Sequence, residues 1–343
     1  MSEKSEIFRR KNDHVRINLE EDVQSSITSG LERIVLNHCA LPEISLENVD
    51  LSTSFLNHKL KMPLLISSMT GGTQESERIN TNLALAAQSA GVAMGLGSQR
   101  AALERTAALS SFRLRRFAPD ILLFANIGAV QLNYGIGVVE CRELVEMATA
   151  DALILHLNPL QEALQPEGDT NFDHLLPKIN HLCRSLSVPV VVKEVGWGIS
   201  DKVAVQLIEA GVAAIDVAGA GGTSWSQVEM FRTADETSRR IASHFRNWGI
   251  PTAQALRSVH RLNPGIPLIA SGGLKTGIDI AKCLALGADL CGMAGRLLHS
   301  ATTSAEEVTN VFNELSKELR ICMFVCGASD IESLKNIGYS END

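Results

Sequence analysis

From Met62 onward, short apolar runs rich in Val, Ile, Leu and Ala recur along the chain, each bounded by glycine or polar residues. Runs of this length and composition are typical of buried strands. They lie at residues 63–68, 92–97, 121–126, 151–157, 189–195, 212–218, 267–271 and 289–294. Residues with helical periodicity fill most of the intervals, as at 75–90, 140–149 and 201–210. Eight strands that alternate with helices predict an α/β protein that forms a single TIM (β/α)8 barrel.

The N-terminal extension, residues 1–61, lies outside this alternation. Its charged segment at 6–16 would, from its charge alone, be interpreted as a solvated tail. After this segment we expect a helix over 23–30 and short strands near 31–36 and 60–61.

The barrel itself is predicted over residues 62–300, followed by a C-terminal helical segment over 301–343. A long interval separates the sixth strand from the seventh, with a helix-like stretch at 227–248 and a second helix near 252–261. We therefore predict an insertion after strand six, which in this fold would lie over the active site. No linker or low-complexity segment divides the chain, so residues 1–343 are expected to form one domain.

Composition narrows the possible partners. The chain has 343 residues and a net charge of −8 at pH 7. This charge argues against a general nucleic-acid-binding protein, so local basic clusters would have to bind anionic ligands. The seven cysteines are scattered without a CxxC pair, which is typical of a reducing cytoplasm. Because no apolar stretch suits a membrane span or a signal peptide, we expect a cytoplasmic protein without a membrane or nucleic-acid partner.

Two glycine-rich turns follow the seventh and eighth predicted strands. They read Ser271-Gly-Gly-Leu-Lys-Thr-Gly277 and Cys291-Gly-Met-Ala-Gly-Arg296. Glycines let backbone N–H groups approach a ligand closely, and the helix start behind each turn favours an anion. One glycine after a strand can simply make a turn, but a TIM barrel uses this pair of turns to hold phosphate. The pair therefore predicts a phosphate-bearing ligand.

Polar side chains follow nearly every predicted strand, at the end of the barrel where active sites lie. Lys193 follows three valines, so it is either paired with a buried carboxylate or faces a ligand. Facing a ligand, it would act as a Schiff-base lysine or as a fixed cation beside a cofactor ring. His156 could equally be a core histidine, and Glu162 could equally face solvent. Trp225, in a glycine loop, is typical of a lid contact.

Taken in order, the motifs of the chain resemble those of the type 2 isopentenyl-diphosphate isomerases, flavoenzymes built on an FMN-binding barrel. The resemblance runs nearly end to end, and its specificity comes from the order and spacing of the motifs. They are Arg10-Lys-Asn-Asp-His14, Ser68-Met-Thr-Gly-Gly72, Gly97-Ser-Gln-Arg100, Asn126-Ile-Gly128, His156-Leu-Asn158, Leu160-Gln-Glu162, Gln165-Pro-Glu-Gly-Asp169, Val192-Lys-Glu-Val-Gly196, Gly221-Gly-Thr-Ser-Trp225, Ser271-Gly-Gly273 and Ala294-Gly-Arg296.

The resemblance implies interconversion of isopentenyl and dimethylallyl diphosphate in isoprenoid biosynthesis, a 1,3-allylic proton shift with reduced FMN as acid and base. The implied FMN contacts are Ser68, Met69, Thr70, Ser98, Asn126, Lys193 and Thr223, with the phosphate on Gly272, Gly273, Ala294 and Gly295. The implied substrate contacts are Arg10, Lys11, Ser98, Gln99, Arg100 and Gln161, with Mg²⁺ on Glu162.

The implied catalytic residues are His156, Gln161 and Lys193. Lys193 would stabilise the anionic side of the reduced flavin. His156 or Gln161 would orient the substrate or relay the proton, a choice that the sequence leaves open. NADPH or NADH would reduce the FMN, residues 219–248 and the amino terminus would close over the site, and family members are commonly homotetramers.

Rival interpretations remain. An FMN-dependent 2-hydroxy-acid oxidase shares the barrel and the phosphate site, but it is expected to carry His-Gly-Gly-Arg where this chain has Gly219-Ala-Gly-Gly-Thr-Ser-Trp225. An inosinate-dehydrogenase-like enzyme would need a cysteine after strand six, and none lies between Cys183 and Cys283. A flavin-free Schiff-base aldolase that uses Lys193 and a non-catalytic flavin-binding barrel are two further interpretations.

Overall fold

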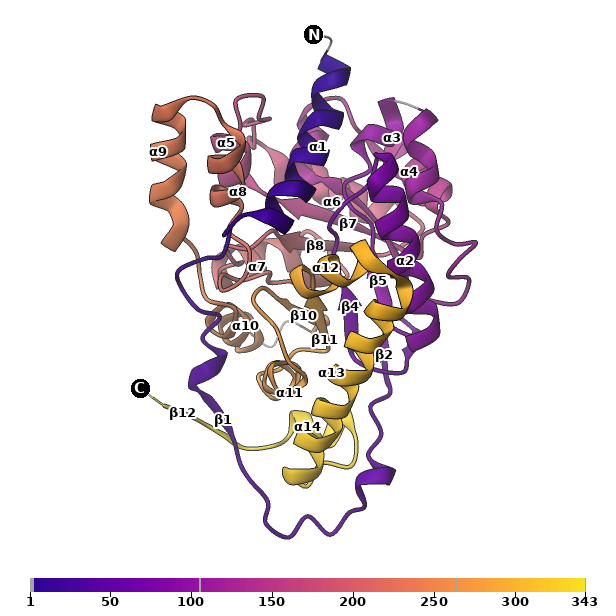
Figure 1. Ribbon diagram of the computed structural model, residues 1–343, viewed down its shortest axis with the longest axis vertical. Coiled ribbons are helices and arrows are strands. Elements are labelled where there is room, and N and C mark those ends of the chain that lie inside the picture. The colour runs from indigo at the N-terminus through magenta and orange to yellow at the C-terminus, as the bar shows by residue number, and fades with distance from the viewer. Residues whose placement is uncertain (1–2, 105, 263–264, 343) are drawn as a thin grey trace.

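The computed structural model describes residues 3–104, 106–262 and 265–342, and its central feature is a closed barrel of eight parallel strands (Figure 1). The strands follow the order β10-β11-β4-β5-β6-β7-β8-β9, so that β9 also pairs with β10. Their bounds are β4 Leu64–Ile66, β5 Ala93–Gly95, β6 Leu123–Gly128, β7 Ala152–Leu157, β8 Val190–Glu194, β9 Ala214–Asp216, β10 Leu268–Ser271 and β11 Leu290–Met293. The predicted barrel and all eight of its strands are confirmed.

Helices surround the barrel, and several begin at a side-chain cap. The side chains of Thr73, Ser200 and Thr276 accept backbone N–H groups in the first turns of α2, α7 and α11, which pairs donors that a helix start leaves free. The bounds are α2 Gln74–Ala90, α3 Arg100–Glu104, α4 Val138–Ala148, α5 Pro159–Leu164, α6 Leu175–Ser185, α7 Asp201–Glu209, α10 Thr252–His260, α11 Gly277–Ala285, α12 Gly295–Thr303, α13 Ala305–Val325 and α14 Ile331–Lys335. Short 3-10 turns lie at η1 Leu31–Arg33, η2 Leu46–Asn48, η3 Thr106–Phe112, η4 Ala129–Asn133 and η5 Phe245–Asn247.

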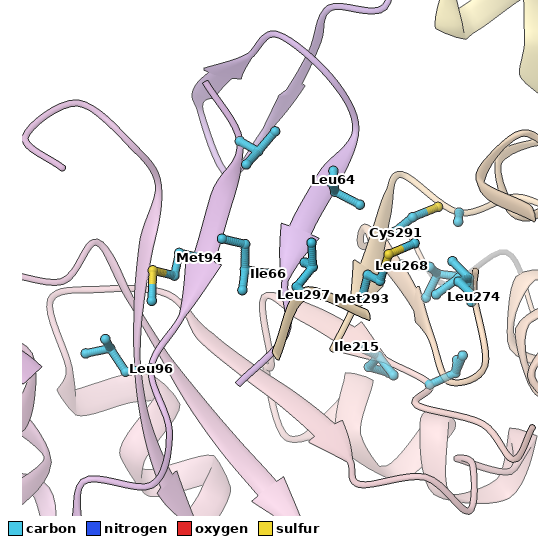
Figure 2. Packing of buried hydrophobic residues seen from close by; sticks show 14 of the residues in the cluster. Leu64, Ile66, Met94, Leu96, Ile215, Leu268, Leu274, Cys291, Met293 and Leu297 are labelled. Carbon is cyan, nitrogen blue, oxygen red and sulfur yellow. The ribbon is translucent and has the colours of Figure 1, made fainter. Parts of the chain in front are cut away.

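Strand residues alternate between the barrel interior and the layer under the helices. The outward-facing residues pack in one large cluster, and Figure 2 shows part of it, including Leu64, Ile66, Met94, Ile215 and Met293. Each strand contributes an apolar inward residue to one layer, and we call this layer the lower tier: Leu65, Ala93, Phe124, Ile154, Val191, Ala214, Ile269 and Leu290. The residue two positions later on each strand forms the upper tier: Ser67, Gly95, Asn126, His156, Lys193, Asp216, Ser271 and Gly292.

The N-terminal extension packs against both ends of the barrel. The hairpin of β2 Thr53–Phe55 and β3 His58–Leu60 adds Phe55 and Leu60 to the cluster that contains the lower tier. At the other end lies α1 Glu3–Glu20, which packs against helices that include α12 and α3. The tail interpretation of residues 6–16 is therefore wrong.

The predicted helix over 23–30 is also wrong, because the backbone of this segment bonds to other loops. The Ser25 N–H donates to the Gly222 carbonyl at 2.8 Å, and the Ser29 carbonyl accepts from the Ala253 N–H at 2.9 Å. Further on, β1 Ile34–Leu36 pairs antiparallel with β12 Tyr339–Glu341, which joins the N-terminal extension to the C-terminal segment.

The insertion after β9 precedes α10 and includes the helices α8 Trp225–Arg232 and α9 Glu236–His244. The stretch at 227–248 was expected to be helical as a whole. It breaks after Arg232 because Asp235 caps α9, accepting the Ser238 N–H at 2.6 Å. Within the described part of the chain, no helix combines the length and the hydropathy that a membrane crossing needs.

Candidate active site

A cavity of about 680 Å³ lies at the carboxyl ends of the barrel strands. Each strand, or the loop directly after it, contributes residues to its wall, and α1 lies along one side with Arg10, Lys11, His14, Val15 and Asn18. A volume of this order is typical of sites for cofactors and other small molecules. The charged segment that the sequence placed outside the barrel pattern is therefore part of the site.

One end of the cavity is formed by the two glycine turns. Gly272 and Gly273 have φ angles of 107° and 77°, values that residues other than glycine rarely adopt. A Cβ atom at Gly272 would also lie 2.0 Å from the Gly219 carbonyl oxygen. Ala294 and Gly295 bring the start of α12 to the same cavity. Turn and helix start together form a site suited to a phosphate group.

The cavity also contains buried hydroxyls without a protein partner. These are the Oγ atoms of Ser67 and Ser68, and both residues line the cavity. A Cβ atom at Gly292 would come within 2.5 Å of the Ser67 Oγ, and one at Gly95 within 2.6 Å of the Ser68 Oγ. Because an unpaired buried polar group costs about 1–3 kcal/mol, these hydroxyls favour a polar ligand against this wall.

His156 is held in one orientation by Asn126. The Asn126 amide donates to the Leu96 carbonyl at 2.9 Å, which leaves its Oδ1 to accept from His156 Nδ1, also at 2.9 Å. Burial, together with the charges of Lys193 and Arg10, lowers the pKa of His156 to about 3. The imidazole is therefore neutral, with Nδ1 protonated and Nε2 able to accept a proton or a hydrogen bond.

Lys193 projects into the same cavity from β8. Its side chain is 7% exposed, and its Nζ donates to the Glu194 carbonyl at 2.6 Å. Two of its three N–H donors remain for a ligand. Burial lowers the pKa of Lys193, and the carboxylates of Asp216 and Glu194 act in the opposite direction.

At the other end of the cavity, positively charged side chains lie around the loop 165–169. Gln165 accepts from Arg10 at 3.0 Å, and Asp169 accepts from both Arg100 and Gln131. Lys11 donates to the Ser98 carbonyl at 2.9 Å. One short loop thus sets the positions of two arginines that come from different parts of the chain, as a site for a multiply charged anion requires.

Glu229 on α8 joins the insertion to the cavity. One carboxylate oxygen contacts His14 at 3.0 Å and Gln161 at 3.1 Å, and the other accepts from Arg232 at 2.6 Å. Burial alone would raise the pKa of Glu229, but His14 and Arg232 outweigh it and lower the pKa to about 2. Glu229 therefore stays ionised and fixes the Gln161 amide.

Glu162 lines the cavity beside this network. Its carboxylate accepts from the Asn158 amide and from the Asp169 N–H, each at 2.8 Å. Burial raises the pKa of Glu162 in spite of these hydrogen bonds. Among the described residues, no cluster of three or more His, Cys, Asp or Glu side chains could enclose a metal ion. A cation at Glu162 would need further oxygen ligands, such as those of a phosphate.

Comparison with known proteins identifies the family. The chain is 52% identical over 338 residues to the isopentenyl-diphosphate delta-isomerase of a Nostoc species, covering 98% of this chain and 97% of the relative. It is 53% identical over 335 residues to the enzyme of the same name from a Synechococcus species, covering 97% and 96%. The chain belongs to the isopentenyl-diphosphate delta-isomerase family.

Two further comparisons agree with this family and with the barrel. A family model described as FMN-dependent dehydrogenase matches residues 145–339. A crystal structure described as a lactate oxidase from Pediococcus acidilactici superposes with a TM-score of 0.70 at 17% identity, covering 99% of this chain and 94% of the oxidase. At this identity the likeness concerns the fold alone.

The residues that the resemblance to these isomerases implied all line the same cavity, with a single exception. The exception is Gln99, whose side chain is fully buried behind the wall. Its Oε1 accepts from the Asn126 N–H at 2.9 Å, and its Nε2 donates to the Leu144 carbonyl at 3.3 Å. The predicted substrate contact of Gln99 is therefore not supported, because its amide already bonds to the backbone.

Several residues of the site could not be assigned a role from the sequence. Glu229 lies in the insertion without a recognisable motif. Asp169 belongs to a family motif, but its contact with Arg100 depends on the loop conformation. Asp216 follows two apolar residues at the end of β9, and it could have been found by comparing the inward positions of all eight strands.

Proposed function

We propose that this chain interconverts isopentenyl and dimethylallyl diphosphate with reduced FMN and Mg²⁺. The observation that carries the proposal is one cavity with two anion-binding ends. Glycine turns and the start of α12 form one end, and Arg10, Lys11 and Arg100 form the other. His156 and Lys193 line the same cavity.

The residues present fit FMN. Gly272, Gly273, Ala294 and Gly295 would hold its phosphate, and Ser68, Met69, Thr70, Ser98, Asn126, Lys193 and Thr223 would hold its ring and chain. The unpaired hydroxyls of Ser67 and Ser68 would gain partners. When bound in its reduced form, FMN supplies an electron-rich ring and an exchangeable proton.

The diphosphate would be bound at the cationic end of the cavity. Arg10, Lys11 and Arg100 present charge-assisted donors to phosphate oxygens. Glu162 would share a Mg²⁺ ion with the same oxygens, which supply the ligands that the protein does not. Binding a cation would also favour the ionised form of this buried carboxylate.

Three side chains would then act near the alkene. The Lys193 ammonium would stabilise negative charge on the cofactor. The neutral His156 can accept a proton at Nε2, while Gln161, whose amide donates to Glu229, can orient the substrate. The helices α1 and α8 would cover the bound substrate and exclude water, so that water does not add to a positively charged transition state.

Three further expectations rest on the resemblance alone. We expect NADPH or NADH to reduce the flavin, the protein to be a homotetramer and its location to be cytoplasmic.

The test is anaerobic incubation of the FMN-loaded enzyme with isopentenyl diphosphate, Mg²⁺ and NADPH in deuterated water. We expect dimethylallyl diphosphate that carries solvent deuterium. Absence of any isomer with saturating reduced FMN would contradict the proposed reaction, and an isomer without deuterium would contradict a solvent-exchangeable proton donor.

A matched pair on α1 tests the substrate end. Arg10 lines the cavity, whereas its neighbour Arg9 is exposed and does not. Arg10→Ala should raise KM for the diphosphate with a smaller effect on kcat, and Arg9→Ala should change neither. Equal effects of the two substitutions would mean that α1 contributes charge but no direct contact.

A further inference from the structure

The upper tier holds two opposite charges on neighbouring strands. Lys193 on β8 pairs in register with Asp216 on β9. Residues in register on parallel strands point to the same face, so both side chains enter the barrel interior. Lys193 lines the cavity, whereas Asp216, at 1% exposure, lies behind the lining.

Asp216 is only partly satisfied by hydrogen bonds. Its Oδ1 accepts from the Ser271 hydroxyl at 2.8 Å and from the Ala218 N–H at 3.1 Å. Its Oδ2 is buried without a partner. Because a buried carboxylate without full pairing is costly, its retention in the middle of the barrel calls for a function.

Lys193 needs a nearby negative charge. Burial favours the neutral form of a lysine unless opposite charge compensates. The titratable groups that face it are His156 on β7, Asp216 on β9 and Glu194 on its own strand, with Arg10 from α1 acting on His156. His156 is neutral, so the compensation falls to the two carboxylates.

Glu194 is engaged elsewhere. Its Oε2 accepts backbone N–H groups of Val195, Gly196 and Trp197 at 2.6, 2.7 and 2.5 Å, so this carboxylate fixes the turn after β8. Among the described residues, no direct ion pair joins Lys193 to either carboxylate. Asp216 therefore acts on Lys193 through space, across the strand register.

We propose that Asp216 is a positioning residue that keeps the Lys193 ammonium charged, so that the lysine presents a permanent positive charge to the flavin. This role rests on the proposed FMN site but requires no particular substrate. This role explains why β9 carries a carboxylate at its upper-tier position although Asp216 does not line the cavity. The lower-tier residue of the same strand, Ala214, is apolar.

The test uses Asp216→Asn, because asparagine has nearly the same shape and its Oδ1 can still accept from Ser271 and Ala218. The flavin midpoint potential of the FMN-loaded protein is measured from about pH 6 to about pH 9, because burial lowers the pKa of a lysine that no opposite charge compensates. The same measurement is made in a Lys193→Arg background, where the cation cannot lose its proton.

We expect Asp216→Asn to introduce a new pH-dependent step when position 193 is lysine. Above this step, loss of the ammonium should weaken the preference for reduced flavin about tenfold, which corresponds to about 30 mV for a two-electron couple. The potential should there approach that of Lys193→Met, which serves as the uncharged reference. In the Lys193→Arg background, Asp216→Asn should produce no step.

Three results would overturn the proposal. A constant, pH-independent offset in both backgrounds would mean that Asp216 acts on the flavin directly. A step in both backgrounds would mean that another group titrates. If Lys193→Met itself leaves the potential unchanged, the placement of Lys193 beside the flavin is wrong, a failure that is separate from the isomerase activity because no substrate is present.

Discussion

The lower and upper tiers of the barrel interior lie two residues apart on the same strands, yet their chemistry is opposite. The lower-tier side chains are apolar and at most 1% exposed. The upper tier contains serines, an asparagine, a histidine, a lysine, an aspartate and glycines. Phe124 and Asn126 on β6 illustrate the change, as do Val191 and Lys193 on β8.

This difference separates what the fold needs from what the site needs. Strand alternation sends both tiers inward equally well, so backbone geometry does not require polar groups in the upper tier. Apolar side chains would stabilise the barrel more, because buried polar groups bring desolvation costs. The upper tier is therefore best explained by a ligand, and substitutions in the two tiers should have different consequences.

The largest expected effect is a loss of stability in the lower tier. Phe124→Ala should lower the free energy of unfolding by about 3–5 kcal/mol, because it removes a ring from a closely packed interior and leaves a cavity. Chemical denaturation measures this change. The folded fraction should keep its KM, and a loss below about 1 kcal/mol would show that the lower tier is not a tightly packed unit.

On β8, one substitution in each tier should separate an effect on catalysis from an effect on stability. Lys193→Met should lower kcat by about 10²–10³-fold, as expected when a fixed charge that stabilises the transition state is removed. Val191→Ala, two residues earlier, should reduce stability and leave kcat of the folded enzyme within a few-fold. Steady-state kinetics with saturating FMN distinguishes the two. A near-normal kcat in Lys193→Met would contradict the claim that the upper tier serves catalysis and the lower tier serves stability.

The pH dependence of stability should show that His156 is buried in its neutral form. Its pKa is about 3 in the folded protein, against 6.5 for a freely solvated histidine, so the unfolded chain binds the extra proton first as the pH falls. Stability is therefore lost below pH 6.5, and this one group should cost about 2 kcal/mol by about pH 5. His156→Gln should lose less stability over that interval in denaturation measurements. Parallel curves for the two proteins would mean that the histidine is not neutral and buried.

The smallest expected effect concerns the loop 165–169, outside both tiers. Asp169→Asn should raise KM for the diphosphate about tenfold, because Arg100 loses the carboxylate that positions it. Asp173→Asn removes the same charge from an exposed side chain nearby and is the matched control. If both substitutions raise KM equally, general charge accounts for the effect and the Arg100 contact does not.

Much of the fold could be predicted because its signal is local. The barrel strands are short apolar runs ended by glycine or polar residues, and alternation with helices defines their arrangement. The structure of the N-terminal extension was harder to predict. Residues 23–30 have a helix-like composition, but contacts with Gly222 and Ala253, distant in sequence, determine their conformation.

The site was predictable where its residues follow strands and belong to family motifs. His156, Lys193 and Gly272 were found in this way. Gln99 was assigned to the substrate because it belongs to the family motif Gly97-Ser-Gln-Arg100. Its neighbours Ser98 and Arg100 do line the cavity, but a motif does not reveal which way each side chain points. Asp216 was not assigned a role, because its importance depends on the strand register.

The central claim is that the upper tier and the strand ends above it bind a reduced flavin on which the isomerisation depends. It is tested most directly by measuring the isomerisation rate anaerobically, with Mg²⁺ present, while the occupancy of the protein by reduced FMN is varied. The rate should be proportional to that occupancy and should vanish for flavin-free or fully oxidised protein. Full activity without reduced flavin would contradict the account.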